Sequence, residues 1–190
     1  MKKTIGFALC GSFCTLQPVL CQLEQLVQDY TVIPIFSENT LQTDSRFGTA
    51  EHFVAALTDL CGTPPLHTLP QVEPLGPKKL LDLMVVAPCT GNTLGKLANG
   101  IADSSVSFAC KAHLRNNRPV VLAISTNDAL AASAENIGKL LVRKNYYFVP
   151  FGQDDWRNKP CSMVAHMELL PETVAAALEG QQLQPLVRNY

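Results

Sequence analysis

The chain has 190 residues, of which 47% are hydrophobic, and its formal net charge is −1. This length suits one compact α/β domain, and the apolar fraction supports a substantial buried core. The near-neutral charge excludes the basic surplus with which proteins neutralise nucleic-acid phosphates, so we expect no nucleic-acid partner. We expect a single domain over residues 1–190, with a tail rich in Gln, Leu and Pro from about residue 180.

The N-terminus combines two lysines with an apolar run at residues 4–10. This run is too short to span a membrane, and no small-residue cleavage site follows it. We therefore expect a cytoplasmic protein with no membrane partner. The seven cysteines are odd in number and contain no CxxC pair, which favours free thiols in a reducing compartment and argues against a metal site.

Apolar and β-branched runs predict strands in chain order at residues 4–10, 30–36, 83–87, 119–124 and 146–149. Apolar positions at helical spacing predict helices at residues 16–28, 49–60, 93–99, 105–115, 134–143 and 171–178. Pro34 indicates that the second strand lies near a sheet edge. Strands that alternate with helices indicate a three-layer α/β/α fold with a doubly wound, mostly parallel sheet of the Rossmann-like or flavodoxin-like kind.

Ligands of such a sheet bind outside the carboxyl ends of its strands. The loop after the first strand holds Gly11, which permits a tight turn, and Ser12, which can donate to an anion. Ser37 follows the second strand, and residues 125–127 follow the fourth, with the candidate side chains Ser125, Thr126 and Asn127. Taken singly, each of these loops is also explained by ordinary turn and helix-cap chemistry.

The most distinctive loop is Ala-Pro-Cys-Thr-Gly-Asn-Thr at residues 87–93. Pro88 ends the predicted strand, Gly91 allows a ligand to approach the backbone, and the start of the next helix offers free N–H groups to an anion. Small polar residues on both sides of the glycine exceed what capping requires. The sequence therefore predicts a phosphate-binding strand-to-helix loop, with candidate binding residues Ala87, Thr90, Asn92 and Thr93.

The run at residues 87–103 resembles the flavin-binding signature of the homo-oligomeric flavin-containing cysteine decarboxylases. That group includes phosphopantothenoylcysteine decarboxylase and the flavin prenyltransferases. Residues 49–54 resemble its second helix, and the resemblance covers nearly the whole chain. It implies FMN as cofactor, with the phosphate held by Gly11, Ser12 and Ser37, and it implies a homo-oligomer.

Four further segments resemble one branch of that group, the B subunits of a two-subunit synthase from spore-forming bacteria; they are residues 73–78, 111–116, 124–128 and 148–155. This resemblance implies an oxidoreductase subunit in the mother cell of a sporulating bacterium. It also implies a nucleotide-binding partner subunit that brings NADP, and a small dihydropyridine dicarboxylate as substrate.

Two family motifs are altered in this chain. Pro74 stands where spacing from Asp82 expects the decarboxylase histidine, and residues 124–127 (Ile-Ser-Thr-Asn) replace a Pro-Ala-Met-Asn motif. Decarboxylation of a cysteine is therefore unsupported. Two alternatives to an oxidoreductase subunit stay open, a stand-alone FMN-dependent decarboxylase and a non-catalytic scaffold that completes the partner's active site.

Oxidation of a dicarboxylate needs cations or hydroxyls for the carboxylates and a group that removes a proton. The candidates for the carboxylates are Lys78, Lys111 and Arg115, of which the last two are also explained by a solvated helix face. His113 is a candidate general base, and Cys89 is a candidate thiolate ahead of a helix N-terminus. A lone histidine on a helix is more often structural, and a free cysteine is more often a small core residue. Residues 154–156 (Asp-Asp-Trp) suit a lid or a partner contact.

Overall fold

Five parallel strands form the body of the sheet in the computed structural model, which describes residues 2–190. Their order is β2 (Thr31–Phe36), β1 (Thr4–Leu9), β3 (Leu83–Cys89), β4 (Val120–Thr126) and β5 (Tyr146–Phe148). The antiparallel strands β6 (Phe151–Gly152) and β7 (Met163–Ala165) extend the sheet, because β7 pairs with the end of β4 and β6 pairs with β7. Pro34 lies in the edge strand β2, as predicted.

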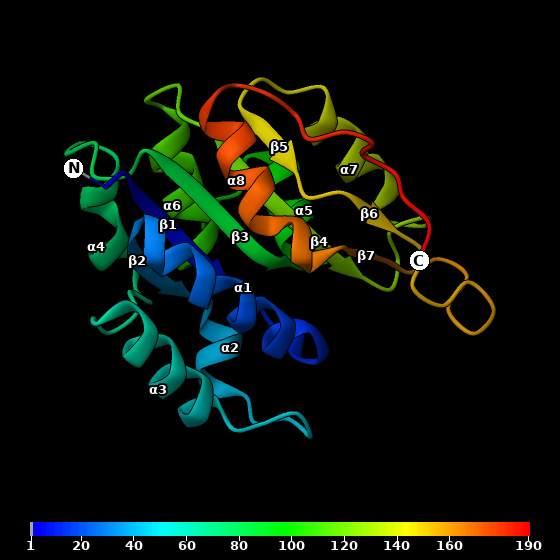
Figure 1. The fold of residues 1–190 in the computed structure, drawn as a ribbon, viewed down its shortest axis with the longest axis horizontal. Coiled ribbons are helices and arrows are strands. Elements are labelled where there is room, and N and C mark those ends of the chain that lie inside the picture. Colours follow the sequence, from blue (N-terminus) through cyan, green and yellow to red (C-terminus); the bar gives the residue numbers. More distant parts are fainter. Residues whose placement is uncertain (1) are drawn as a thin grey trace.

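Helices cover both faces of this sheet (Figure 1). Helices α1 (Leu16–Asp29) and α8 (Leu170–Leu178) pack on one face, while α5 (Gly91–Asn99), α6 (Ser105–Leu114) and α7 (Ala134–Leu141) pack on the other. Helix α3 (Ala50–Cys61) contacts α1 and the edge strand β2. The predicted three-layer fold is thus confirmed. The short helices are α2 (Glu38–Gln42), α4 (Leu69–Val72) and the 3-10 helices η1 (Phe13–Thr15), η2 (Glu73–Leu75) and η3 (Met167–Leu169).

Strand β3 is two residues longer than predicted, because its pairing with β4 shifts register between Val86 and Cys89. This irregularity accommodates Pro88, which has no N–H to give to a ladder. Helix α5 then begins at Gly91 rather than Thr93, with Thr90 as its N-cap. The elements α2, α4, β6 and β7 were not predicted, since two to five residues are too few for a periodic pattern.

Strand β1 has β2 on one side and β3 on the other. The chain therefore crosses from β1 to β2 in one direction along the sheet and returns past β1 to reach β3 in the other direction. In open parallel sheets this reversal leaves a crevice at the carboxyl ends of the two strands that diverge, here β1 and β3. Within residues 2–190, no helix has the length and apolar content needed to cross a membrane.

The tail beyond residue 180 folds back onto the sheet (Figure 1). Phe151 N–H donates to Leu186 O at 3.0 Å, and Arg188 N–H donates to Phe151 O at 3.0 Å. These bonds place the end of the chain beside β6, the strand that leads into the loop at residues 153–162.

Candidate functional site

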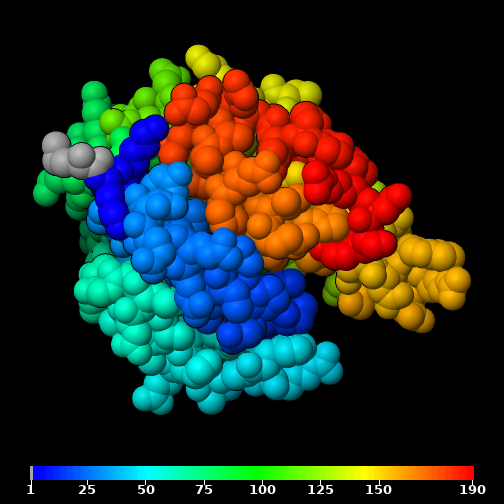
Figure 2. All heavy atoms as spheres, viewed as in Figure 1, coloured from blue at the N-terminus to red at the C-terminus, as the bar shows by residue number. Residues whose placement is uncertain are grey.

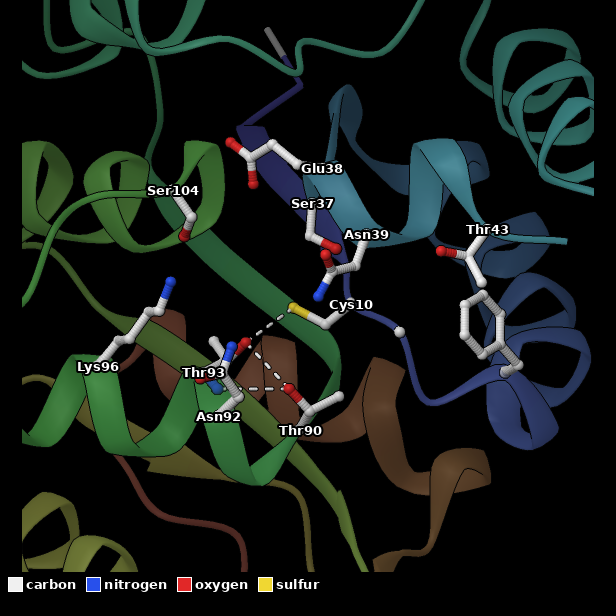
Figure 3. Close-up of a pocket in the computed structure, with 12 residues that line it drawn as sticks. Cys10, Ser37, Glu38, Asn39, Thr43, Thr90, Asn92, Thr93, Lys96 and Ser104 are labelled. Atoms are coloured by element: carbon white, nitrogen blue, oxygen red, sulfur yellow. Dashed lines mark hydrogen bonds between the residues drawn. The ribbon is translucent and has the colours of Figure 1, made fainter. Parts of the chain in front are cut away.

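A cavity of about 370 Å³ lies where β1 and β3 end, and we call it the switch-point cavity. It brings together five predicted cofactor-binding residues that lie far apart in sequence, Gly11, Ser37, Thr90, Asn92 and Thr93. Figure 3 shows the hydroxyl groups of Ser37, Thr90 and Thr93 and the amide group of Asn92 around one hollow. These residues come together because loops that follow neighbouring parallel strands meet at one edge of the sheet, as expected from the sequence.

Three helix N-caps, those of α2, α5 and α6, line the switch-point cavity. Ser37 caps α2, Thr90 caps α5 and Ser104 caps α6, each by accepting a backbone N–H three residues on. The positive ends of α5 and α6 therefore face the same space, which favours a bound anion. Of the described residues that line the cavity, Lys96 alone is a cation, and its Nζ lies 2.8 Å from Asp103 Oδ1.

The two threonines of the loop after β3 are fixed by a short chain of hydrogen bonds (Figure 3). Thr90 Oγ1 accepts from Thr93 N–H at 3.3 Å, and Thr93 Oγ1 donates to Cys10 Sγ at 3.3 Å. Burial raises the pKa of the Cys10 thiol to about 11. Cys10 is consequently a neutral acceptor that holds Thr93 in place, and it is not a thiolate nucleophile.

Helix α2 carries the other wall of the switch-point cavity and is tied to α6. Glu38 Oε1 accepts the Ser105 N–H at 2.9 Å, and Ser105 Oγ donates to Phe36 O at 2.6 Å. These bonds hold Ser37 and Asn39 opposite the start of α5. Sequence reasoning missed Asn39, Lys96 and Ser104. A signal existed for Lys96, which lies inside the run at residues 87–103, and for Ser104, which directly precedes a predicted helix.

A second hollow of about 350 Å³, the serine cavity, continues from the first and shares Gly11, Phe13 and Thr90 with it. It is lined by the predicted residues Ser12, Ser125, Thr126 and Asn127. Ser12 Oγ and Ser125 Oγ are 2.7 Å apart, and Thr15 Oγ1 donates to Ser125 Oγ at 3.3 Å. These hydroxyls form a polar floor.

The serine cavity lies between two projecting segments, and Figure 2 shows a recess between them at the right of the molecule. One segment, at residues 41–48, contributes Phe47, and the other is the loop at residues 153–162, which contributes Asp154, Lys159 and Ser162. Asp154 accepts from Ser162 Oγ at 2.7 Å and pairs with Lys159 at 3.3 Å. Partial burial by itself would raise the pKa of the Asp154 carboxyl. The hydrogen bonds from Ser162 and Lys159 outweigh this effect, so the pKa of Asp154 is lowered. We call the two cavities together the groove.

Gly91 also has a packing role that the sequence did not predict. A Cβ at this position would lie 2.7 Å from Thr126 Oγ1 and 2.9 Å from Asp128 Oδ1. Asp128 Oδ1 itself accepts from Thr126 Oγ1 at 2.5 Å and from Ser133 Oγ at 2.9 Å. The missing side chain thus makes room for the loop after β4, and Gly91 also lines a hollow with Asn92 and Asn127.

The prediction of His113 as general base is wrong in position. Its side chain is 0% exposed, and its Nε2 lies 3.0 Å from Pro119 O, just before β4 begins. Helix α6 runs antiparallel to the strands, so its last turn lies at the edge of the sheet opposite the groove. Burial lowers the pKa of His113 to about 4, and it is therefore a neutral structural residue.

Three other predicted residues also lie outside the groove. Ala87 and Cys89 are inside β3 with 0% exposure, because the strand is longer than predicted, and burial raises the pKa of the Cys89 thiol well above its ordinary value. Lys78 follows η2 in a turn that leads to the start of β3, and it lines neither cavity. Within residues 2–190, no group of three or more His, Cys, Asp and Glu side chains is arranged to hold a metal ion.

The chain is similar to several known proteins. The family described as Flavoprotein matches residues 1–174. The B subunit of dipicolinate synthase from Bacillus subtilis (strain 168) is 51% identical over 190 residues, which cover 99% of this chain and 95% of that protein. The crystal structure of the B subunit of dipicolinate synthase from Bacillus halodurans C gives a TM-score of 0.90 at 46% identity, over 100% of this chain and 99% of that one.

A more distant structure shares the fold alone. It is the dodecameric FMN-dependent Ubix-like decarboxylase from Escherichia coli O157:H7, with a TM-score of 0.60 at 21% identity, over 77% of this chain and 79% of that one.

Proposed function

The chain belongs to the flavoprotein family and, within it, to the B subunits of dipicolinate synthase, and on this premise we propose that it acts with the nucleotide-binding partner subunit of that synthase to oxidise dihydrodipicolinate to dipicolinate for bacterial spores. The observation that carries the proposal is the convergence of the capped ends of α5 and α6 and of Lys96 on one polar cavity. Such a cavity suits a phosphate-bearing cofactor beside a carboxylate-bearing substrate.

FMN fits the switch-point cavity by the chemistry of its donors. The hydroxyls of Ser37, Thr90 and Ser104 and the ammonium of Lys96 would hold the phosphate. When bound, FMN supplies an acceptor for two electrons. The hydroxyls of Ser12 and Ser125, together with Lys159, would hold the substrate carboxylates in the serine cavity.

The oxidation removes two electrons and two hydrogens from the dihydropyridine ring, which becomes aromatic. One hydrogen leaves as a proton to solvent or a base, and the other leaves as a hydride equivalent. This hydride equivalent needs an acceptor, which FMN on this chain or NADP on the partner subunit would supply. We further propose a homo-oligomer, because a Ubix-like decarboxylase of the same fold is dodecameric, and a location in the cytoplasm of the mother cell, which the use of dipicolinate in spores implies.

A second candidate is a non-catalytic scaffold that completes the active site of the partner subunit. It is favoured by one observation, that His113, Cys89 and Lys78 all lie outside the groove. In that case the groove would bind ligand and orient it, and the proton and the electrons would be handled by the partner.

An assay of the partner subunit, of this chain and of their mixture, each with and without added FMN, separates these possibilities. Dipicolinate is followed by its ultraviolet absorbance, and FMN binding by quenching of flavin fluorescence. We expect FMN to bind this chain and activity to need both proteins. Activity of the mixture without any flavin bound favours the scaffold. Full activity of the partner subunit on its own contradicts both proposals, and release of CO₂ by this chain alone would point to a decarboxylase.

A further inference from the structure

The last five residues form a strap, defined here as residues 186–190, along the outer side of the β6–β7 hairpin (Figure 1). Val187 makes a parallel bridge to Phe151, whose N–H and C=O are bonded to Leu186 and Arg188. Gly152 admits the strap, since a Cβ there would overlap the carbonyl oxygen of Arg188. Only glycine lets the strap approach β6 so closely.

Tyr190 fastens the end of the strap to the other strand of the hairpin. Its hydroxyl shares its one proton between Val164 O at 3.2 Å and Ala165 O at 3.0 Å. Its ring stacks on His166, with centroids 4.1 Å apart and planes 17° apart. The strap therefore holds both β6 and β7.

The hairpin is packed into the core through Phe151, Met163 and Ala165, but its backbone pairing is short. Strand β6 has two residues and β7 has three, and β7 pairs with β4 only through Val164 opposite Ser125 and Met163 opposite Thr126. Two-stranded hairpins of this size are marginal on their own. Yet the loop that the hairpin carries, residues 153–162, contributes Asp154, Lys159 and Ser162 to the serine cavity.

We propose that the strap positions the loop at residues 153–162 over the serine cavity, with Tyr190 as the positioning residue. Three contacts link Tyr190 to the floor of the serine cavity. The Tyr190 hydroxyl binds the backbone of Val164, Val164 pairs with Ser125, and Ser125 Oγ contacts Ser12 Oγ on the cavity floor. The effect on substrate rests on the proposed function, whereas the effect on the loop does not. When the strap is loosened, the loop opens more often and the substrate binds less tightly, while the chemical step is unchanged.

Limited trypsin digestion of the full chain tests the first half of this proposal, because Arg157 is exposed in the loop. Cleavage of a native loop follows the population of its open state. Tyr190→Phe keeps the ring and removes the one hydrogen bond that the hydroxyl shares between two carbonyls. Tyr147→Phe is the matched control, since the Tyr147 hydroxyl makes no hydrogen bond within residues 2–190. We expect cleavage after Arg157 to be roughly fivefold faster in Tyr190→Phe, the factor expected from one lost hydrogen bond, and unchanged in Tyr147→Phe. Gly152→Ala, which displaces the Arg188 carbonyl, is expected to have a larger effect.

Steady-state kinetics with the partner subunit test the second half. In Tyr190→Phe, KM for dihydrodipicolinate is expected to rise by roughly the same factor, with kcat unchanged. Equal cleavage rates in wild type and Tyr190→Phe would overturn the proposal, and so would faster cleavage with an unchanged KM. An inactive mixture of the two proteins would count against the proposed function, while the cleavage rates alone would still decide whether the strap holds the loop.

Discussion

Gly91 and Thr126 lie so close together that a Cβ on Gly91 would be 2.7 Å from Thr126 Oγ1. Gly91 is the first residue of α5, and Thr126 is the last residue of β4. Their contact joins the loop after β3 to the loop after β4, and both loops line the groove. The position of the α5 N-terminus, and with it the anion-binding end of the helix, depends on this packing.

Gly91→Ala is expected to lower the free energy of unfolding by about 1–3 kcal/mol, the usual effect of overpacking. The helix propensity of alanine is about 1 kcal/mol more favourable than that of glycine, so helix propensity alone would stabilise this variant. Urea unfolding measures the difference. Gly95→Ala, in the same helix, is the control, because its Cβ would meet nothing nearer than Asn136 Nδ2 at 3.6 Å, and it should be neutral or stabilising. Similar changes in both variants would refute the packing explanation.

Lys96→Gln is expected to weaken FMN binding by roughly tenfold to a hundredfold, as for a lost hydrogen bond to a charged group. Riboflavin, which has no phosphate, should bind equally well to both proteins. Fluorescence titration gives both dissociation constants. Lys139→Gln serves as the control, since Lys139 pairs with Glu135 on α7 and lines neither cavity. An equal loss of affinity for riboflavin would mean that Lys96 does not contact the phosphate.

The burial of His113 predicts a loss of stability in mild acid. Burial lowers its pKa from an ordinary 6.5 to about 4, so protonation is disfavoured in the folded state. The stability that this contributes is complete above pH 6.5 and is lost as the pH falls toward 4, by on the order of 3 kcal/mol. Urea midpoints between pH 7 and pH 4 should therefore fall less steeply in His113→Gln than in wild type. Parallel curves would assign the acid sensitivity to other groups.

The cysteines should divide sharply in reactivity. Cys14 and Cys21 are exposed, while Cys10, Cys89 and Cys110 are buried and burial raises the pKa of each thiol. Iodoacetamide at pH 8, followed by peptide mass spectrometry, should label the two exposed thiols rapidly. The three buried thiols should react only after denaturant is added. Fast labelling of Cys89 in the native protein would make it a candidate nucleophile again.

The raised pKa of the Cys10 thiol, about 11, also predicts that the stability contributed by the neutral thiol is lost as the pH rises from 9 to 11.

The sequence by itself determined the five parallel strands, the helices between them and the edge of the sheet at which the candidate binding residues gather. Periodicity is a local signal, and the rule that ligands bind at the carboxyl ends of parallel strands needs only strand order and direction. For this reason Gly11, Ser37 and Thr90, from three separate loops, could be assigned to one cavity before any contact was known.

Only the tertiary structure decided which edge or layer of the sheet each candidate catalytic or binding side chain occupies. His113 lies in the last turn of α6, and the antiparallel course of that helix carries it to the edge away from the groove. Cys89 is buried because a register shift lengthens β3, and Ser104 and Lys96 reach the cavity through helix packing. The hairpin of β6 and β7, and the strap that holds it, are stabilised by residues distant in sequence, and no local pattern encodes such pairing.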